Sequence, residues 1–109
     1  MEIKRLHLIV KKIFKKNGLN SVDAKTCADA LINAELVGAP SHGLSRLKMY
    51  CDRISKKVIN PKAKIKVKKI SPSIAHVDGN NSIGFVAANI AIKTAISYAK
   101  KTGIGLVAV

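Results

Sequence analysis

The chain has 109 residues, which is enough for one ordinary domain or for part of a larger one. Its formal net charge is +14, but aromatic residues make up only 4% of it and Lys greatly outnumbers Arg. Proteins that bind single-stranded nucleic acid rely on aromatic stacking, and proteins that read base edges rely on Arg, so this composition disfavours a nucleic-acid function. A membrane span is not predicted either, because Asn89 and Lys93 interrupt the longest apolar stretch.

The two cysteines, Cys27 and Cys51, are too far apart for a Cys-x-x-Cys pair, and no metal site is predicted. Each lies on the apolar side of a predicted helix, where a thiol behaves as a small buried hydrophobe. The apolar run at residues 6–10 is too short for a signal peptide. These features are typical of a protein of the reducing cytoplasm.

Three helices are predicted in the first half of the chain. Residues 3–17 carry an apolar stripe at helical spacing, and Gly18 offers the left-handed stop that follows many helices. The second helix, residues 21–37, has Ser21 as its N-cap and shows a face of small residues suited to close packing. A third helix is predicted over about residues 41–57.

The second half is predicted to be a small sheet with a covering helix. A linker rich in Lys, Asn and Pro marks a boundary after Val58, which divides the chain into a helical subdomain, 1–58, and a mixed domain, 59–109. Residues 64–68 alternate Lys with apolar residues and predict a half-buried strand with a solvated lysine face. Residues 74–78 predict a second short strand.

A last helix is predicted over residues 84–101. The residues expected to face the core are Phe85, Ala88, Ile92, Ala95, Ile96 and Ala99. Residues 106–109 follow as a buried-strand pattern without a turn or polar tail, which favours the N-terminal part of a longer protein. No Gly-x-Gly-x-x-Gly motif occurs. The predicted fold class is therefore α+β and non-Rossmann, with an N-terminal three-helix subdomain followed by the start of a mixed sheet and helix domain.

The most informative segment is Ser41-His42-Gly43-Leu44-Ser45-Arg46, directly after a Gly-Ala-Pro break. In a helix that begins here, His42 and Arg46 are four residues apart and share one face. A guanidinium can bind a carboxylate through two hydrogen bonds while an imidazole exchanges a proton near neutral pH. Ser41 is placed to cap this helix, whose free amides favour an anion. The pattern predicts a site for a small anionic acid, although a solvated polar face has the same spacing.

Glu35 is the one acidic residue close before this segment. Two interpretations of it remain open at this point. It is either a partner for His42 or Arg46, or an exposed carboxylate without a role in the site.

Residues 34–50, Ala-Glu-Leu-Val-Gly-Ala-Pro-Ser-His-Gly-Leu-Ser-Arg-Leu-Lys-Met-Tyr, resemble the N-terminal signature of the malate/L-lactate dehydrogenase family. This family comprises non-Rossmann, NAD(P)-dependent 2-oxoacid reductases, among them sulfolactate, ureidoglycolate and diketogulonate dehydrogenases. The resemblance continues through Ile59-Asn60-Pro61, Val77-Asp78-Gly79 and residues 99–109, in the family's order. One departure is Lys57, near which the family usually has a glycine.

The resemblance implies hydride transfer between the nicotinamide of NAD or NADP and C2 of a small 2-hydroxy or 2-oxo acid. Carried over by motif, His42 is the acid–base catalyst, Arg46 holds the substrate carboxylate and Ser41 hydrogen-bonds the bound acid. The resemblance assigns no residue to the cofactor, and it implies a homodimer for the full-length protein. Because family members are much longer, we expect the 109-residue chain to be inactive alone. A small basic binding or assembly module without catalysis is the alternative.

Overall fold

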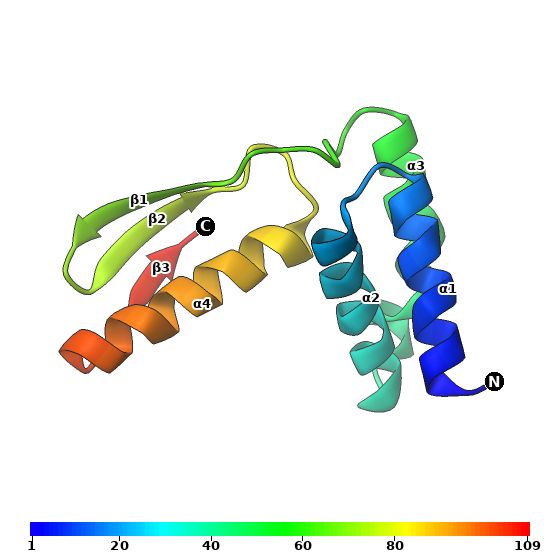
Figure 1. The fold of residues 1–109 in the computed structure, drawn as a ribbon, viewed down its shortest axis with the longest axis horizontal. Coiled ribbons are helices and arrows are strands. Elements are labelled where there is room, and N and C mark those ends of the chain that lie inside the picture. Colours follow the sequence, from blue (N-terminus) through cyan, green and yellow to red (C-terminus); the bar gives the residue numbers. More distant parts are fainter. The chain divides into compact units, whose positions relative to one another are not determined.

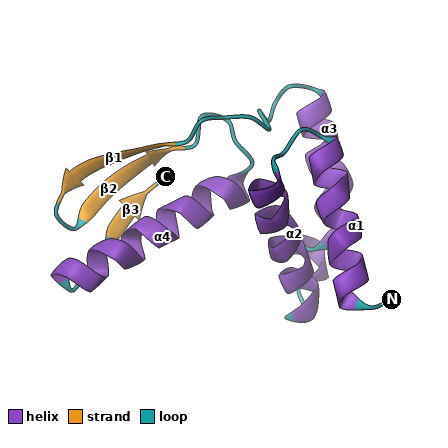
Figure 2. Cartoon of the chain, viewed as in Figure 1, coloured by secondary structure: helices purple, strands orange, loops and turns teal.

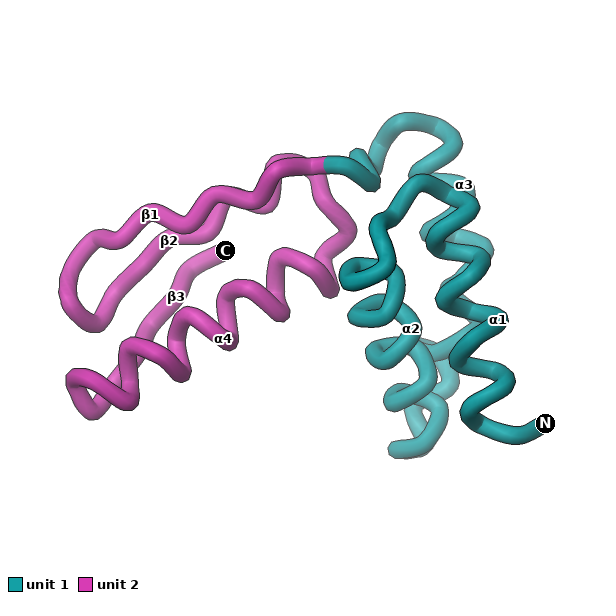
Figure 3. Tube along the Cα trace, in the orientation of Figure 1, with its two compact units in different colours: residues 1–62 teal, residues 63–109 magenta.

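The computed structural model describes residues 1–109, and the chain forms two compact units, 1–62 and 63–109 (Figure 3). The first unit consists of helices and 3₁₀ turns, and the second combines a small mixed sheet with one helix (Figure 1). This architecture confirms the predicted fold class. None of the helices has the length and hydropathy needed to cross a lipid bilayer.

In the first unit, α1 (Ile3–Lys16) and α2 (Ser21–Leu36) pack against each other and enclose most of its core. The buried residues are Val10, Phe14, Leu19, Ala24, Cys27, Ala28, Leu31 and Ile32. Small residues on α2 let the two helices approach closely around the fully buried Phe14. Burial raises the pKa of the Cys27 thiol to about 12, with a smaller contribution from nearby Asp23, as expected for a packing residue rather than a reactive one.

The start of α2 differs from the prediction, because Asn20 and not Ser21 caps the helix. The side-chain oxygen of Asn20 accepts a hydrogen bond from the Asp23 backbone N–H at 2.8 Å, which satisfies one of the free amides of the first turn. Asn and Ser are comparably good N-caps, so sequence alone does not separate two such neighbours.

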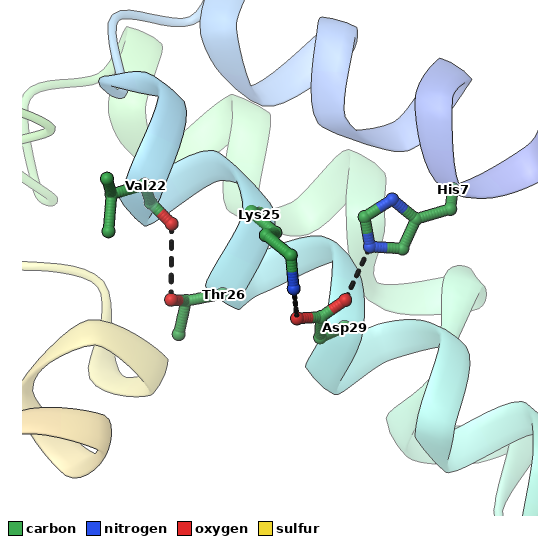
Figure 4. A network of polar contacts seen from close by, with 5 residues as sticks. All are labelled: His7, Val22, Lys25, Thr26 and Asp29. Atoms are coloured by element: carbon green, nitrogen blue, oxygen red, sulfur yellow. Dashed lines mark hydrogen bonds and ion pairs between the residues drawn. The ribbon is translucent and has the colours of Figure 1, made fainter. Parts of the chain in front are cut away.

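A polar network on the surface joins α1 to α2 (Figure 4). Asp29 of α2 contacts His7 of α1 at 2.5 Å and Lys25 of its own helix at 2.6 Å. Burial alone would raise the pKa of Asp29, but hydrogen bonds and charge from Lys25 and His7 outweigh it and lower that pKa. Thr26 donates to the Val22 carbonyl within α2, as Figure 4 also shows. His7 is therefore a half-buried residue that links the two helices.

The predicted third helix begins later than expected. Two 3₁₀ turns, η1 (Pro40–His42) and η2 (Leu44–Arg46), precede α3, which spans Leu47–Ser55. Gly43 between the turns has φ −98° and ψ −138°, far from helical values, so its backbone cannot belong to an α-helix. The prediction that one helix carries His42 and Arg46 on a common face is therefore wrong.

The end of α3 is closed by a residue other than glycine in left-handed conformation. Lys57 has φ 61°, its N–H donates to Ile54, and the N–H of Val58 donates to Arg53. This is the Schellman pattern, in which glycine is usual at the position of Lys57. The glycine that the resemblance leads us to expect near this position would adopt this conformation freely. Lys57 adopts the same conformation under strain.

In the second unit, β1 (Lys66–Ser71), β2 (Ile74–Asp78) and β3 (Leu106–Ala108) form a sheet in the order β1-β2-β3. The β1–β2 pair is antiparallel and the β2–β3 pair is parallel, with α4 (Gly84–Thr102) as the crossover. The helix lies along one face of the sheet (Figure 2). The buried residues are Ala75, Val77, Ile83, Val86, Ala87 and Ala91.

The prediction for β2 is confirmed, whereas β1 begins two residues after the predicted strand and extends to Ser71. The set of residues predicted to face inward from α4 is wrong for the middle of the helix. Ile92 and Ile96 are 56% and 48% exposed, and the small residues Ala87 and Ala91 face the core instead. Near Ala95 the helix approaches the chain just before β3 closely.

Gly105, just before β3, shows how close this approach is. A Cβ atom at Gly105 would lie 2.0 Å from the carbonyl oxygen of Ala95 in α4. Only glycine permits this contact between two backbones.

Candidate active site

The candidate site begins where α2 ends. Gly38 has a left-handed backbone, with φ 78°. Its N–H donates to the backbone carbonyl of Glu35, and the N–H of Ala39 donates to that of Ala34. These two bonds form a Schellman motif and satisfy the last carbonyls of the helix. The chain then turns sharply into Pro40, and the candidate residues follow directly.

The two 3₁₀ turns are tied together by side chains that reach back along the chain. Ser45 Oγ donates to the Pro40 carbonyl, and Arg46 Nε donates to the Ser41 carbonyl, each at 2.8 Å. These bonds bring Arg46 back to Ser41 and replace the helical geometry that the sequence predicted. The segment 40–46 is therefore held by specific hydrogen bonds and is not a continuous helical turn.

The Glu35 side chain makes a hydrogen bond to the backbone of this segment. Its Oε1 accepts the backbone N–H of Leu44 at 2.8 Å, and both residues are half-buried. A Cβ atom at Gly43 would lie 2.4 Å from the same oxygen, so the approach depends on glycine. Both predicted interpretations of Glu35 are wrong, because it pairs with neither His42 nor Arg46 and is not simply an exposed carboxylate.

Ser41 and His42 lie together. Ser41 Oγ is 3.0 Å from His42 Nδ1, and both side chains are exposed. The hydroxyl accepts a hydrogen bond when Nδ1 carries the proton, and it donates one when Nδ1 is unprotonated. The pair is therefore compatible with either tautomer of the ring. In both cases Nε2 points its lone pair or its N–H away from this bond and stays available for proton exchange.

Arg46 has no acidic partner in the chain, since the ion pairs of the structure join His7 and Lys25 to Asp29 and Lys48 to Asp52. Its Nε is engaged by Ser41, and Nη1 makes only a long contact of 3.9 Å with the Met49 sulfur. The two Nη groups are thus the part of the guanidinium that can bind an anion. They suit the two oxygens of a carboxylate.

Four backbone amides of the segment are already bonded, whereas the predicted helix start would leave its first amides free. Those of His42, Gly43 and Arg46 donate to carbonyls within the segment and its approach, and that of Leu44 donates to Glu35. Ser41 does not cap α3, whose N-cap is Arg46 without a side-chain bond. These four amides are therefore not available to an anion.

Two open pockets of the first unit lie elsewhere. One is lined by Ile54, Lys57, Ile59, Asn60 and Pro61, and the other by Ile3, Lys4, His7 and Leu8. Neither includes a residue of the candidate site, and neither has the glycine-rich loop that holds dinucleotide phosphates. These residues do not fit a nicotinamide dinucleotide, so we assign no cofactor residue.

Comparison with known proteins agrees with the predicted resemblance. The family model described as malate/L-lactate dehydrogenase matches residues 1–109. Malate dehydrogenase of Pyrococcus abyssi is 45% identical over 95% of the chain, and ureidoglycolate dehydrogenase (NAD(+)) of Escherichia coli K12 is 32% identical over all of it. The solved structure of malate dehydrogenase from Pyrococcus horikoshii OT3 superimposes with a TM-score of 0.94, at 40% identity over 98% of the chain.

The chain spans only 29%, 32% and 31% of these three proteins, respectively. The match nevertheless extends over every element of the fold and includes the segment that carries Ser41, His42 and Arg46. From this agreement of sequence, fold and local motif, we conclude that the chain belongs to the malate/L-lactate dehydrogenase family.

Proposed function

We propose that the chain supplies the substrate-binding side of an NAD(P)-dependent dehydrogenase of small 2-hydroxy acids. The main support is the position of Arg46, whose Nη groups have no acidic partner and whose Nε is tied to the backbone of Ser41, beside the Ser41–His42 pair. In a chain of this family, an anchored guanidinium next to a serine–imidazole pair suits the carboxylate and the hydroxyl of such an acid.

Each residue has one role in this proposal. Arg46 binds the carboxylate through its two Nη groups, which fixes the acid relative to the protein. His42 Nε2 takes the hydroxyl proton during oxidation and returns it during reduction. Ser41 orients the imidazole through Nδ1 and keeps a hydrogen-bonding position for the acid. Oxidation also removes a hydride from C2, which in this family goes to a nicotinamide.

The cofactor and assembly belong to the same proposal. The Escherichia coli relative is named for NAD(+), and we propose NAD or NADP here, held by segments that the longer relatives possess. A homodimer in the cytoplasm is the proposed state of the full-length protein. The proposed domain boundary lies after Val58, with the acid-binding residues in the helical subdomain.

The exposure of the site supports inactivity of the 109-residue chain alone. Ser41, His42 and Arg46 all face solvent. An ion pair in such a position contributes only about 0–1 kcal/mol, because water screens it and the side chain loses entropy. Further protein must cover the bound acid before Arg46 binds it strongly.

The proposal can be tested in a chimera that carries residues 1–109 in place of the matching segment of the Pyrococcus horikoshii enzyme. We expect NAD- or NADP-dependent malate oxidation by the chimera and none by the 109-residue chain. His42→Ala should lower kcat by about 10²–10⁴-fold, the usual contribution of an acid–base group. Arg46→Ala should raise KM for malate by roughly tenfold or more, as expected for a lost charged hydrogen bond.

Lys48→Ala is the matched control, because Lys48 is exposed next to the segment and pairs only with Asp52. It should leave both kinetic constants unchanged. A folded chimera without turnover, or one that tolerates both His42→Ala and Arg46→Ala, would refute the proposed function. The basic binding module would then become the better interpretation.

A further inference from the structure

We propose that Glu35 is a positioning residue of the candidate site, and that Gly43 is the complementary position that admits its carboxylate. Glu35 does not touch the acid in this proposal. It fixes the segment from which Ser41, His42 and Arg46 project, and its importance for catalysis rests on the proposed function.

The first argument is the location of Glu35 in the last turn of α2. A carboxylate at the negative end of the helix dipole is unfavourable, so an acid at this position needs a compensating donor. The structure supplies one, because the Leu44 N–H donates to Glu35 Oε1 at 2.8 Å. A hydrogen bond to an ionised acceptor is stronger than a neutral one, especially when it is half-buried.

The second argument is the fit between Glu35 and Gly43. A Cβ at Gly43 would meet three atoms of the Glu35 side chain, at 2.4, 2.7 and 2.9 Å. Gly43 is buried, and Glu35 occupies the space that a Cβ at this position would need. Glu35 and Gly43 are thus complementary, because the carboxylate of Glu35 fills the space that a side chain at position 43 would need.

The third argument is where the bond acts. Leu44 opens η2, the turn that ends at Arg46, and the N–H of Arg46 donates to Gly43. His42 lies immediately before Gly43 on the other side. A bond at Leu44 therefore acts at the junction between the histidine and the arginine. Its loss removes one of the bonds that fix the two turns, beside those of Ser45 with Pro40 and of Arg46 with Ser41.

The proposal predicts different results for two substitutions of Glu35. Glu35→Gln removes the charge but keeps an oxygen that accepts the Leu44 N–H, whereas Glu35→Ala removes the acceptor. In NMR spectra of the 109-residue chain, Glu35→Ala should speed exchange of the Leu44 amide by about tenfold or more and shift the ring nitrogens of His42 and the Nε–H of Arg46. Glu35→Gln should restore most of these signals.

Gly43→Ala should resemble Glu35→Ala, because the added methyl displaces the carboxylate. The double variant should then change the Leu44 exchange rate little beyond either single one, since both remove the same bond. Lys48→Ala is the control and should leave the segment unchanged. Unchanged Leu44 exchange and unchanged His42 and Arg46 signals in Glu35→Ala would overturn the proposal.

The catalytic consequence is measured in the chimera, where Glu35→Ala should raise KM for malate about tenfold and Glu35→Gln should recover most of the loss. Altered NMR signals without any change in KM or kcat would overturn the positioning role. An inactive parent chimera would count against the proposed function instead, and the exchange rates would still decide whether Glu35 holds the segment.

Discussion

The contact between Gly105 and α4 gives a sharp prediction about the second unit. In Gly105→Ala, the new Cβ would lie 2.0 Å from the Ala95 oxygen, 2.8 Å from its carbonyl carbon and 3.0 Å from its Cα. All three are backbone atoms, so no side-chain rotation relieves the clash. The strand must retreat by about 1 Å or more to reach an ordinary van der Waals distance.

Overpacking of this kind costs about 1–3 kcal/mol, and we expect the upper end because backbone meets backbone. The retreat also strains the bond from Leu106 N–H to the Ser73 carbonyl and the parallel pairing of Ala75 with Val107. Three short strands form a marginal sheet, so a loss of about 3 kcal/mol should disorder β3. The assay is urea unfolding followed by circular dichroism, with hydrogen exchange of the β2 and β3 amides.

Gly84→Ala is the matched control, because a Cβ there meets nothing within 4 Å and its φ is not positive. It should be neutral or stabilise the chain by about 0.4–1 kcal/mol through the unfolded state. The difference between the two variants isolates the clash from the general effect of replacing glycine. The reasoning would be refuted if the free energies of unfolding of Gly105→Ala and Gly84→Ala agreed within about 0.5 kcal/mol.

Two further changes test local strain and charge. Lys57→Gly should stabilise the chain by about 0.5–1 kcal/mol in urea unfolding, because φ 61° strains any residue with a Cβ. Lys56→Gly, at φ −80°, should not stabilise it, and equal effects of the two changes would contradict this explanation. Asp29→Asn should destabilise the chain at pH 7 by less than about 1 kcal/mol, since the carboxylate is half-exposed. The folded-state pKa of Asp29 lies below its ordinary value of 3.8, so this contribution is present above pH 3.8 and is lost as the pH falls through the folded pKa. Unfolding measured at pH 7 and in acid should show the difference shrink, and a difference that is constant with pH would argue against it.

Much of the fold was predictable because its signals are local. The apolar stripe of α1, the small residues of α2 and the alternation in β2 are periodic patterns that burial enforces. The orientation of α4 was not predictable in this way. Its isoleucines favour one face, but the close approach of Gly105 to Ala95 selects the alanine face for the core. That selection depends on a contact between residues distant in sequence, which periodicity does not contain.

The candidate site shows a similar division. The motif around His42 identified which residues to inspect, yet the predicted helix and the predicted cap were wrong. Pro40 and the non-helical backbone of Gly43 break the helix, and the Leu44 N–H donates to Glu35 instead of to a helical carbonyl. In the sequence, the available signal was a glycine, Gly43, eight residues after a lone acid, Glu35. Only the three-dimensional structure shows that the two are in contact.

The exchange of a helix start for two 3₁₀ turns changes how this segment can bind an anion. A helix start would offer several free amides and a dipole, and the arginine would then be one contributor among several. Here the amides of His42, Gly43 and Leu44 are already bonded, so in the proposed function Arg46 is the main donor to the carboxylate. Arginine can do this while it is anchored, because Nε–H donates to the Ser41 carbonyl and leaves the two Nη groups for a carboxylate. A lysine would present its three N–H groups from a single nitrogen and lacks the planar pair of Nη groups, so we expect Arg46→Lys to lose the paired hydrogen bonds to a carboxylate.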